Sequence, residues 1–260
     1  MVRRARLDAE LVRRGLARSR EQAAELVHAG RVKVAGATAT KPATAVEPGT
    51  PVLIEADSDD PGYASRGGHK LAGALDALPV PVEGRRVLDA GASTGGFTDV
   101  LLRRGAREVV AVDVGYGQLA WQLRTDPRVS VHDRTNVREL TPDQIGGPVE
   151  LTVADLSFIP LTLVLPALAA CTTEDLLPMV KPQFEVGRER VGAKGVVRDP
   201  RLRAEAIRTV ADRAYALGLG TLGMTRSALP GPAGNVEFFL WLRRDAPPVD
   251  PAEIARVVEL

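Results

Sequence analysis

The stretch formed by residues 87–97 constrains the fold more than any other part of the chain. It reads Val-Leu-Asp-Ala-Gly-Ala-Ser-Thr-Gly-Gly-Phe, an apolar run followed by a glycine-rich turn, and a helical pattern begins at Phe97. Glycine lets the backbone turn sharply and approach a ligand closely. The N-terminus of a helix behind such a turn presents free N–H groups to that ligand. This order predicts a buried strand, a ligand-binding turn and a helix.

The spacing of the glycines narrows the choice of ligand. A phosphate-binding P-loop requires a lysine where this chain has Phe97. A dinucleotide fingerprint requires a glycine where it has Ser93. The remaining pattern resembles the first motif of S-adenosylmethionine-dependent methyltransferases, and the alternative is an ordinary tight turn. On this resemblance we expect S-adenosyl-L-methionine to bind Gly91, Ala92, Ser93, Thr94, Gly95 and Gly96.

Beyond the loop, apolar strand patterns alternate with helical patterns. Strands are expected over residues 108–113, 128–133, 149–155, 175–181 and 236–242, and a helix over residues 201–217. Such alternation predicts a parallel, doubly wound α/β sheet that binds its ligands at the carboxyl ends of the strands. Together with the loop, it predicts a Rossmann-like class I methyltransferase domain over residues 61–260.

A charged side chain closes each of four expected strands, namely Asp113, Asp133, Asp155 and Lys181. Because the ends of parallel strands meet at one edge of a sheet, we expect these side chains to share a crevice. Asp113 follows Gly91 by 22 residues, near the offset at which an acidic residue binds a ribose diol. Asp133 is a candidate for binding the adenine amino group. Alternatively, such aspartates cap the next helix.

The N-terminal region is basic, although the net charge of the whole chain is only +1. Residues 1–41 contain ten Lys/Arg and four Asp/Glu, and their pattern predicts two short helices and a small hairpin. Residues 19–23 and 30–36 resemble the alpha-L RNA-binding module of ribosomal small-subunit protein four and of pseudouridine synthases. The alternatives are a solvated cap and a helix-turn-helix DNA reader.

That resemblance implies a small α+β RNA-binding domain, which would contact phosphates and helical shape. We place it at residues 1–60, including an acidic linker. The RNA contacts expected from it are Arg4, Arg6, Arg18, Arg20, Arg31 and Lys33.

Six ordered motifs extend a second resemblance over nearly the whole chain. They lie at residues 65–71, 89–98, 134–138, 155–159, 181–187 and 234–238. With the N-terminal module, they resemble the TlyA (hemolysin A) family of ribosomal RNA ribose methyltransferases, whose catalytic domain is similar to the FtsJ (RrmJ) enzymes. The resemblance implies cytidine 2'-hydroxyls of the small or large ribosomal subunit, or both, as the substrate. It also implies a catalytic tetrad, which the motifs place on Lys70, Asp155, Lys181 and Glu237.

These residue types suit methyl transfer to a hydroxyl oxygen, which needs neither a metal nor a covalent intermediate. A desolvated Lys181 would serve as the general base. Asp155 and Glu237 would orient the lysines and the hydroxyl, and Lys70 would stabilise negative charge that develops on the oxygen. The sequence leaves the route of the proton open.

Two rival methyltransferase chemistries fit less well. Enzymes that modify nucleobase amino groups carry a Pro-Pro-aromatic sequence after the fourth strand, where this chain has Leu156-Ser157-Phe158. Carbon-five cytosine enzymes need a cysteine nucleophile, and Cys171 lies in the wrong context for that role.

A second basic segment is expected in the loop over residues 185–200. We predict that Arg188, Arg190 and Lys194 bind the RNA backbone there. The alternative is a solvated surface loop.

Composition argues against several other classes of protein. The lone cysteine, Cys171, precludes an internal disulfide and favours a reducing compartment, and the three histidines lack metal-ligand spacing. The uncharged run over residues 156–173 contains two prolines and indicates a buried helix rather than a membrane span. We therefore expect a cytoplasmic protein without a metal site, a membrane span or an obligate protein partner. A non-catalytic ribosome assembly factor and a membrane-active hemolysin stay open as alternatives.

Overall fold

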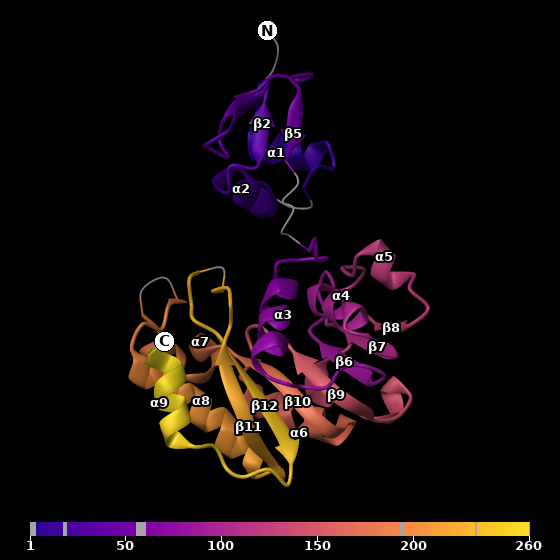
Figure 1. Ribbon diagram of the computed structural model, residues 1–260, viewed down its shortest axis with the longest axis vertical. Helices are drawn as coiled ribbons and strands as arrows, with labels where there is room; N and C mark the ends of the chain where they lie inside the picture. The colour runs from indigo at the N-terminus through magenta and orange to yellow at the C-terminus, as the bar shows by residue number, and fades with distance from the viewer. Residues whose placement is uncertain (1–3, 18–19, 56–60, 193–194, 232, 260) are drawn as a thin grey trace. The chain divides into compact units, whose positions relative to one another are not determined.

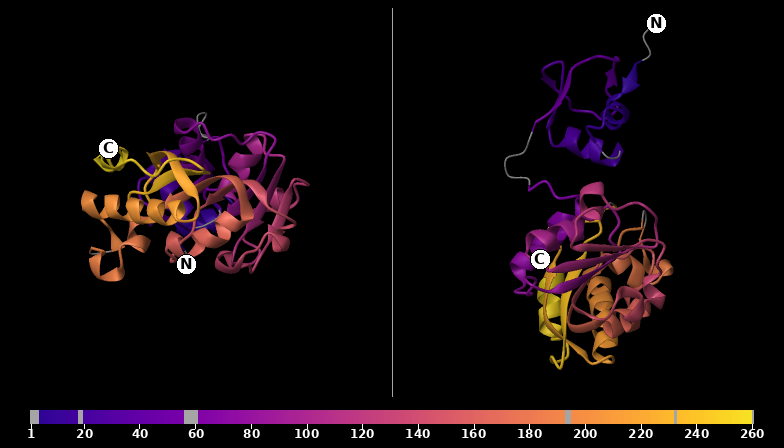
Figure 2. Two further views of the ribbon diagram at one scale, coloured as in Figure 1. Left: turned by 90° about the horizontal axis from the view of Figure 1, so that it is seen from below. Right: turned by 90° about the vertical axis from the view of Figure 1, so that its right-hand side faces the viewer.

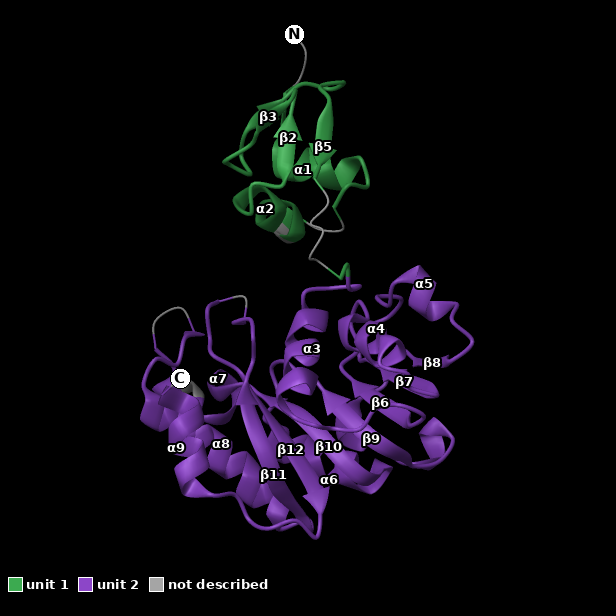
Figure 3. Ribbon diagram, in the orientation of Figure 1, with its two compact units in different colours: residues 1–62 green, residues 63–260 purple. Residues whose placement is uncertain are grey.

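The computed structural model describes residues 4–17, 20–55, 61–192, 195–231 and 233–259. The chain divides into two compact units, residues 1–62 and 63–260 (Figure 3). The boundary predicted at residue 60 falls at the end of a segment, residues 56–60, that lies outside the described residues. Each unit has its own hydrophobic core.

The N-terminal unit combines two helices with two small antiparallel sheets. Strand β1 pairs with β4, and β2 lies between β3 and β5. The apolar side chains Leu7, Leu11, Ala23 and Val27, which recur at helical spacing, are all buried in one core. Its elements are β1 (Ala5–Arg6), α1 (Leu7–Arg13), α2 (Arg20–His28), β2 (Val32–Val34), β3 (Ala37–Thr38), β4 (Ala45–Val46) and β5 (Val52–Ile54).

The C-terminal unit is built on one seven-stranded sheet (Figure 1). The strands are β6 (Arg86–Ala90), β7 (Glu108–Val112), β8 (Val129–His132), β9 (Val149–Ala154), β10 (Thr172–Val180), β11 (Leu219–Arg226) and β12 (Phe238–Arg244). They lie in the order β11-β12-β10-β9-β6-β7-β8. Neighbours among β6 to β10 pair in parallel, which confirms the predicted core of the sheet.

Strand β12 departs from the predicted parallel arrangement, because it runs antiparallel to both β10 and β11. The segment 227–237 connects β11 directly to β12, and a short connection of this kind joins antiparallel strands. The sequence did not predict β11. The reversal matters for function because Phe238 pairs with Val180, so the beginning of β12 lies where β10 ends.

Helices cover both faces of this sheet (Figure 2). One face packs against α3 (Gly67–Ala77), α4 (Gly96–Arg103) and α5 (Trp121–Arg124). The other packs against α6 (Leu161–Cys171), α8 (Pro200–Tyr215) and α9 (Pro251–Glu259). A single turn, α7 (Pro182–Glu185), follows β10. The central strands are runs of Val, Leu and Ala because both of their faces are buried.

The uncharged run predicted to form a buried helix corresponds to α6. Cys171 at its end is buried, and burial raises the pKa of its thiol to about 11, which suits packing rather than nucleophilic attack. Within the described part of the chain, no helix is both long enough and apolar enough to cross a membrane.

Candidate active site

The glycine-rich loop connects β6 to α4 at the carboxyl edge of the sheet. Gly91 and Gly95 have φ angles of +88° and +95°, a region that residues with a Cβ disfavour. A Cβ on Gly91 would lie 2.5 Å from the carbonyl oxygen of Asp155, so the close approach of the loop to the end of β9 also requires glycine. The predicted order of strand, turn and helix is therefore confirmed.

The two aspartates predicted to bind adenosine lie at the ends of the neighbouring strands β7 and β8. Asp113 accepts hydrogen bonds from the backbone N–H groups of Ser93 at 2.8 Å and Gly115 at 2.7 Å, so it braces the glycine loop. Asp133 forms an ion pair with Arg124 at 2.9 Å, and this guanidinium holds the pKa of Asp133 below its usual range. Their contacts to a cofactor stay predictions.

A third carboxylate, Asp89, lies at the base of the loop and was not predicted as a site residue. Its side chain is fully buried, and its Oδ2 accepts a hydrogen bond from Thr98 at 2.6 Å. Among the described residues, no donor reaches its Oδ1. Burial raises the pKa of Asp89 to about 7, and the negative charges of Asp155 and Asp113 add to this effect. A buried acceptor of this kind suits a cationic ligand.

Two residues of the predicted tetrad, Lys70 and Glu237, form a buried ion pair. Lys70 lies in the first turn of α3, and Glu237 immediately precedes β12. The Nζ and Oε2 atoms are 2.6 Å apart, and the two residues are 7% and 1% exposed. A Cβ on Gly231 would lie 2.6 Å from Oε1 of Glu237, so the loop before β12 packs closely around this carboxylate.

The other two residues of the tetrad, Lys181 and Asp155, form a second ion pair at the ends of β10 and β9. Their Nζ and Oδ1 atoms are 2.6 Å apart. Lys181 also donates a hydrogen bond to Oγ of Ser157 at 2.9 Å. An ammonium group has three donors, so these two contacts leave one donor for a further ligand. The pairing of β10 with β12 places both ion pairs at the same edge of the sheet.

An exposed aromatic ring lies beside the second pair. Phe158 follows Ser157, has a φ angle of +66° and is 91% exposed. Its ring lies 5.3 Å from that of Phe184, which follows Lys181 on α7. A non-glycine residue with positive φ stores backbone strain, and such strain concentrates at functional sites. The only sequence signal for Phe158 was its place inside the 155–159 motif.

The basic residues predicted in the N-terminal unit bond to acidic residues or carbonyls of the same unit. The side chains of Arg4, Arg6 and Arg20 are nonetheless 66%, 53% and 60% exposed. Arg18 lies outside the described residues. The partners are Glu47 for Arg4, Asp8 for Arg6 and Arg20, Glu55 for Lys33, and the backbone carbonyl of Glu55 for Arg31.

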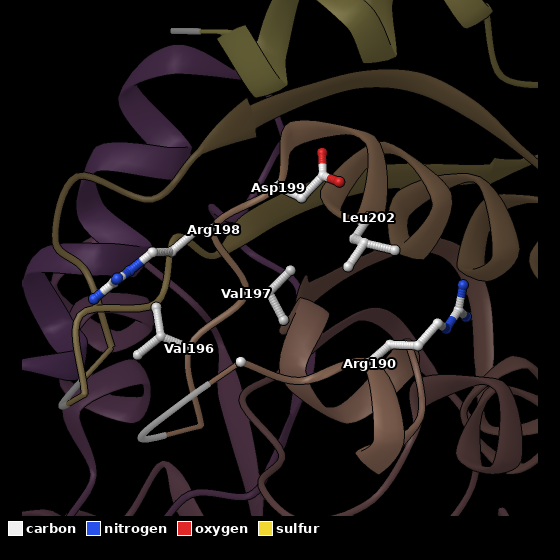
Figure 4. A pocket seen from close by; sticks show the side chains of 7 residues that line it. Arg190, Val196, Val197, Arg198, Asp199 and Leu202 are labelled. Carbon is white, nitrogen blue, oxygen red and sulfur yellow. The ribbon is translucent and has the colours of Figure 1, made fainter.

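The second basic segment is the loop between α7 and α8. Arg190 forms an ion pair with Glu205 at 2.7 Å and donates to the carbonyl of Val186 at 2.7 Å. Lys194 and the side chain of Arg188 lie outside the described residues. A pocket of about 220 Å³ is lined by this loop and the start of α8 (Figure 4), with Arg190, Val196, Val197, Arg198, Asp199 and Leu202 around it.

The C-terminal unit has a class I methyltransferase fold and is joined to a small N-terminal unit. The features that define this fold are the strand order, the glycine loop and the sheet edge that carries the paired lysines. Residues 63–244 match the FtsJ-like methyltransferase family, and residues 5–52 match the S4 domain.

Characterised relatives match most of the chain. The 16S/23S rRNA (cytidine-2'-O)-methyltransferase TlyA of Mycobacterium tuberculosis is 63% identical, over 94% of this chain and 91% of that protein. The 23S rRNA (cytidine-2'-O)-methyltransferase TlyA of Campylobacter jejuni is 32% identical, over 69% and 70% of the two chains. A solved structure from Streptococcus thermophilus, provisionally named a hemolysin, has a TM-score of 0.79 and 39% identity, and the match covers 100% of this chain and 96% of that one. The chain therefore belongs to the FtsJ-like methyltransferase family and, within it, to the TlyA family.

Proposed function

We propose that this protein transfers a methyl group from S-adenosyl-L-methionine to the 2'-hydroxyl of a cytidine in ribosomal RNA. The observation that carries the proposal is the pair of lysine–carboxylate contacts at one edge of the sheet, beside the glycine loop. The names of the TlyA relatives support ribosomal RNA as the substrate. Such a reaction takes place in the cytoplasm, where ribosomes are assembled.

The residues at the loop fit the proposed cofactor. The unsatisfied Oδ1 of Asp89 is a buried acceptor suited to an ammonium group, and the loop that follows it turns at Gly91 and Gly95, whose φ angles are positive. Asp113 and Asp133 are the candidates for the ribose and adenine groups. When bound, the cofactor supplies an electrophilic methyl group on a sulfonium.

We assign the contact with the 2'-hydroxyl to Lys181. Asp155 and Ser157 hold its Nζ, which leaves one hydrogen-bonding direction of this atom for the substrate. In its neutral form the amine would accept the hydroxyl proton as the oxygen takes the methyl group and the carbon–sulfur bond of the sulfonium breaks, and Asp155 would then pair with the resulting ammonium. Lys70, held by Glu237, contributes positive charge that stabilises the developing oxyanion.

We propose that the base of the target nucleotide stacks on Phe158. Phe158 follows Ser157, which binds Lys181, and its exposed ring contacts that of Phe184. Exposed aromatic rings stack on unpaired bases in single-stranded RNA. Stacking there would place the ribose of that nucleotide close to Lys181.

We assign the grip on surrounding RNA to the S4 domain and to the loop between α7 and α8. The side chains of Arg4, Arg6 and Arg20 are more than half exposed, although Asp8, the partner of Arg6 and Arg20, is buried. An ion pair exposed on both sides, such as Arg4–Glu47, contributes about 0–1 kcal/mol, so a phosphate can replace that carboxylate as the partner. Binding of this kind weakens steeply with added salt.

The test is transfer of labelled methyl from S-adenosylmethionine to purified, unmodified ribosomal subunits, with Lys181→Ala in parallel. The proposal predicts label in RNA that blocks alkaline cleavage at one cytidine and is lost in the variant. Cofactor binding without label on either subunit would instead favour the non-catalytic assembly factor. Leakage of lipid vesicles caused by the pure protein at low concentration would favour the membrane-active alternative.

A further inference from the structure

One buried amide side chain connects the basic loop to the loop that carries Glu237. Asn235 is 2% exposed. Its Oδ1 accepts a hydrogen bond from the backbone N–H of Val197 at 2.9 Å, and its Nδ2 donates to the carbonyl of Gly195 at 2.8 Å. Asn235 lies in the β11–β12 connection, whereas Gly195 and Val197 lie between α7 and α8, so the amide joins segments about 40 residues apart.

In the basic loop, the Asn235 amide binds a residue that the hydrophobic core holds in place. The side chain of Val197 is 2% exposed and belongs to the main core cluster. The carbonyl of Val197 accepts a hydrogen bond from Arg203 of α8 at 3.1 Å, so both of its peptide groups are occupied. The next residue, Arg198, is exposed and lines the pocket shown in Figure 4. RNA phosphates that contact Arg198 would therefore act directly on the segment held by Asn235.

On the catalytic side, the same residue shapes the loop around Glu237. The carbonyl of Asn235 accepts a hydrogen bond from the N–H of Gly231 at 2.9 Å, and Gly231 is the residue that packs against the Glu237 carboxylate. The carbonyl of Glu237 in turn accepts from Ser227 at 2.8 Å. A shift of Asn235 therefore moves both the backbone that carries Glu237 and the glycine that confines its side chain.

We propose that Asn235 is a positioning residue that couples RNA contact at residues 195–198 to the placement of Glu237, and through Glu237 to Lys70. The inference rests on the proposed function and assigns a regulatory link within the same site. An asparagine is required because the bridge needs a donor and an acceptor on one short side chain. Aspartate keeps the acceptor but sets a carboxylate against the Gly195 carbonyl, and alanine removes both bonds.

The kinetic test compares Asn235→Ala, Asn235→Asp and Arg198→Ala. The control is Gln144→Ala, which removes another side-chain amide bound to a backbone N–H, at 2.8 Å from Thr141 and away from the site. We expect both Asn235 variants to lower kcat on ribosomal subunits by about 10-fold to 100-fold, because misplacement by about 1 Å has effects of that size. Affinity for S-adenosylmethionine and the far-ultraviolet circular dichroism spectrum should match those of the control.

The double variant Asn235→Ala/Arg198→Ala separates coupling from a merely structural role. If Asn235 transmits RNA contact, Arg198→Ala lowers kcat in the wild-type background but not in the Asn235→Ala background. Equal effects of Arg198→Ala in the two backgrounds, or an Asn235→Ala variant that behaves like the control, would overturn the inference.

Amide hydrogen exchange tests the same link without turnover. In the wild type, binding of unmodified ribosomal subunits should slow exchange at residues 195–198 and also at residues 227–237. In Asn235→Ala, protection should be limited to the first segment. Protection of both segments in the variant would refute the coupling even if the methylation assay failed. A wild type that binds subunits without methylating them would count against the proposed function instead.

Discussion

The two lysine–carboxylate pairs have the same N–O distance of 2.6 Å but very different surroundings. In the Lys70–Glu237 pair, the carboxylate side chain is 1% exposed, whereas in the Lys181–Asp155 pair it is 24% exposed and an accessible phenyl ring lies nearby. We call them the closed pair and the open pair. On this difference we propose separate tasks for them: the open pair contacts the substrate, and the closed pair fixes charge behind it.

The largest effect that we predict from this comparison is on the free energy of unfolding. Removal of one partner of a buried pair leaves an uncompensated charge, so Glu237→Ala should lower the free energy of unfolding by about 3–5 kcal/mol. Asp155→Ala should lower it less, by about 1–3 kcal/mol, because Lys181, although only 7% exposed, keeps its hydrogen bond to Ser157. Urea unfolding at neutral pH measures both. The double variant Lys70→Met/Glu237→Leu is the control and should recover part of the loss. Equal losses for the two single variants would remove the distinction between the pairs.

The aromatic ring beside the open pair should contribute to the binding of RNA and not to the binding of the cofactor. A stacked base contributes about 1–3 kcal/mol, so Phe158→Ala should raise KM for ribosomal subunits or lower kcat/KM by about 5-fold to 100-fold. Phe158→Tyr keeps the ring and should stay within about 2-fold of the wild type. Affinity for S-adenosylmethionine, measured by calorimetry, should be the same in all three proteins. A loss of cofactor affinity in Phe158→Ala would contradict the assignment.

The negative charge of Asp155, in the open pair, also raises the pKa of Asp89. Its pKa is raised to about 7, and a cationic cofactor favours the ionised carboxylate. Affinity for S-adenosylmethionine should therefore fall as the pH decreases through 7, by about 10-fold per pH unit well below the pKa. The negative charge of Asp155 contributes to the shift, so Asp155→Asn should move the midpoint to lower pH. Asp89→Asn should abolish the pH dependence; a midpoint unchanged by Asp155→Asn would argue against the electrostatic contact.

The smallest effect is expected at Ser157, which holds the lysine of the open pair from its second side. Ser157→Ala removes one hydrogen bond to a charged group and should lower kcat by roughly 3-fold to 10-fold, with unchanged cofactor affinity. Ser157→Thr retains the hydroxyl and serves as the control. A loss as large as that of Lys181→Ala would indicate that Ser157 itself contacts the substrate.

Local patterns were enough to predict where the strands around the proposed cofactor site end, although not the role proposed for Asp89. Each expected strand between residues 87 and 181 ends within a residue or two of its observed end, so Asp113, Asp155 and Lys181 lie at the predicted edge. The reason is physical: the buried parts of these parallel strands are mostly apolar, and the charged residue that follows each apolar run marks the point where the strand leaves the core. The glycine loop was predictable for the related reason that positive φ angles select glycine.

The catalytic half depends on contacts between distant segments, which a single sequence does not encode locally. Lys70 and Glu237 are 167 positions apart, and only a family resemblance linked them. The residues of β12 do not predict that it runs antiparallel to its neighbours, because a buried apolar strand has the same residue pattern in either direction. Ser157 and Asn235 were missed because short polar residues are common in loops, and their importance arises from partners that only the folded chain supplies.

The reversed strand has a consequence for the order in which the protein becomes active during synthesis. A chain is synthesised from its N-terminus. The ribosome therefore releases the S4 domain, the glycine loop and the strands β6 to β10 before Glu237 has been synthesised. Until the β11–β12 hairpin inserts beside β10, Lys70 lacks its carboxylate and the edge of the sheet is incomplete. The proposed site is complete only after the β11–β12 hairpin has been synthesised and paired with β10.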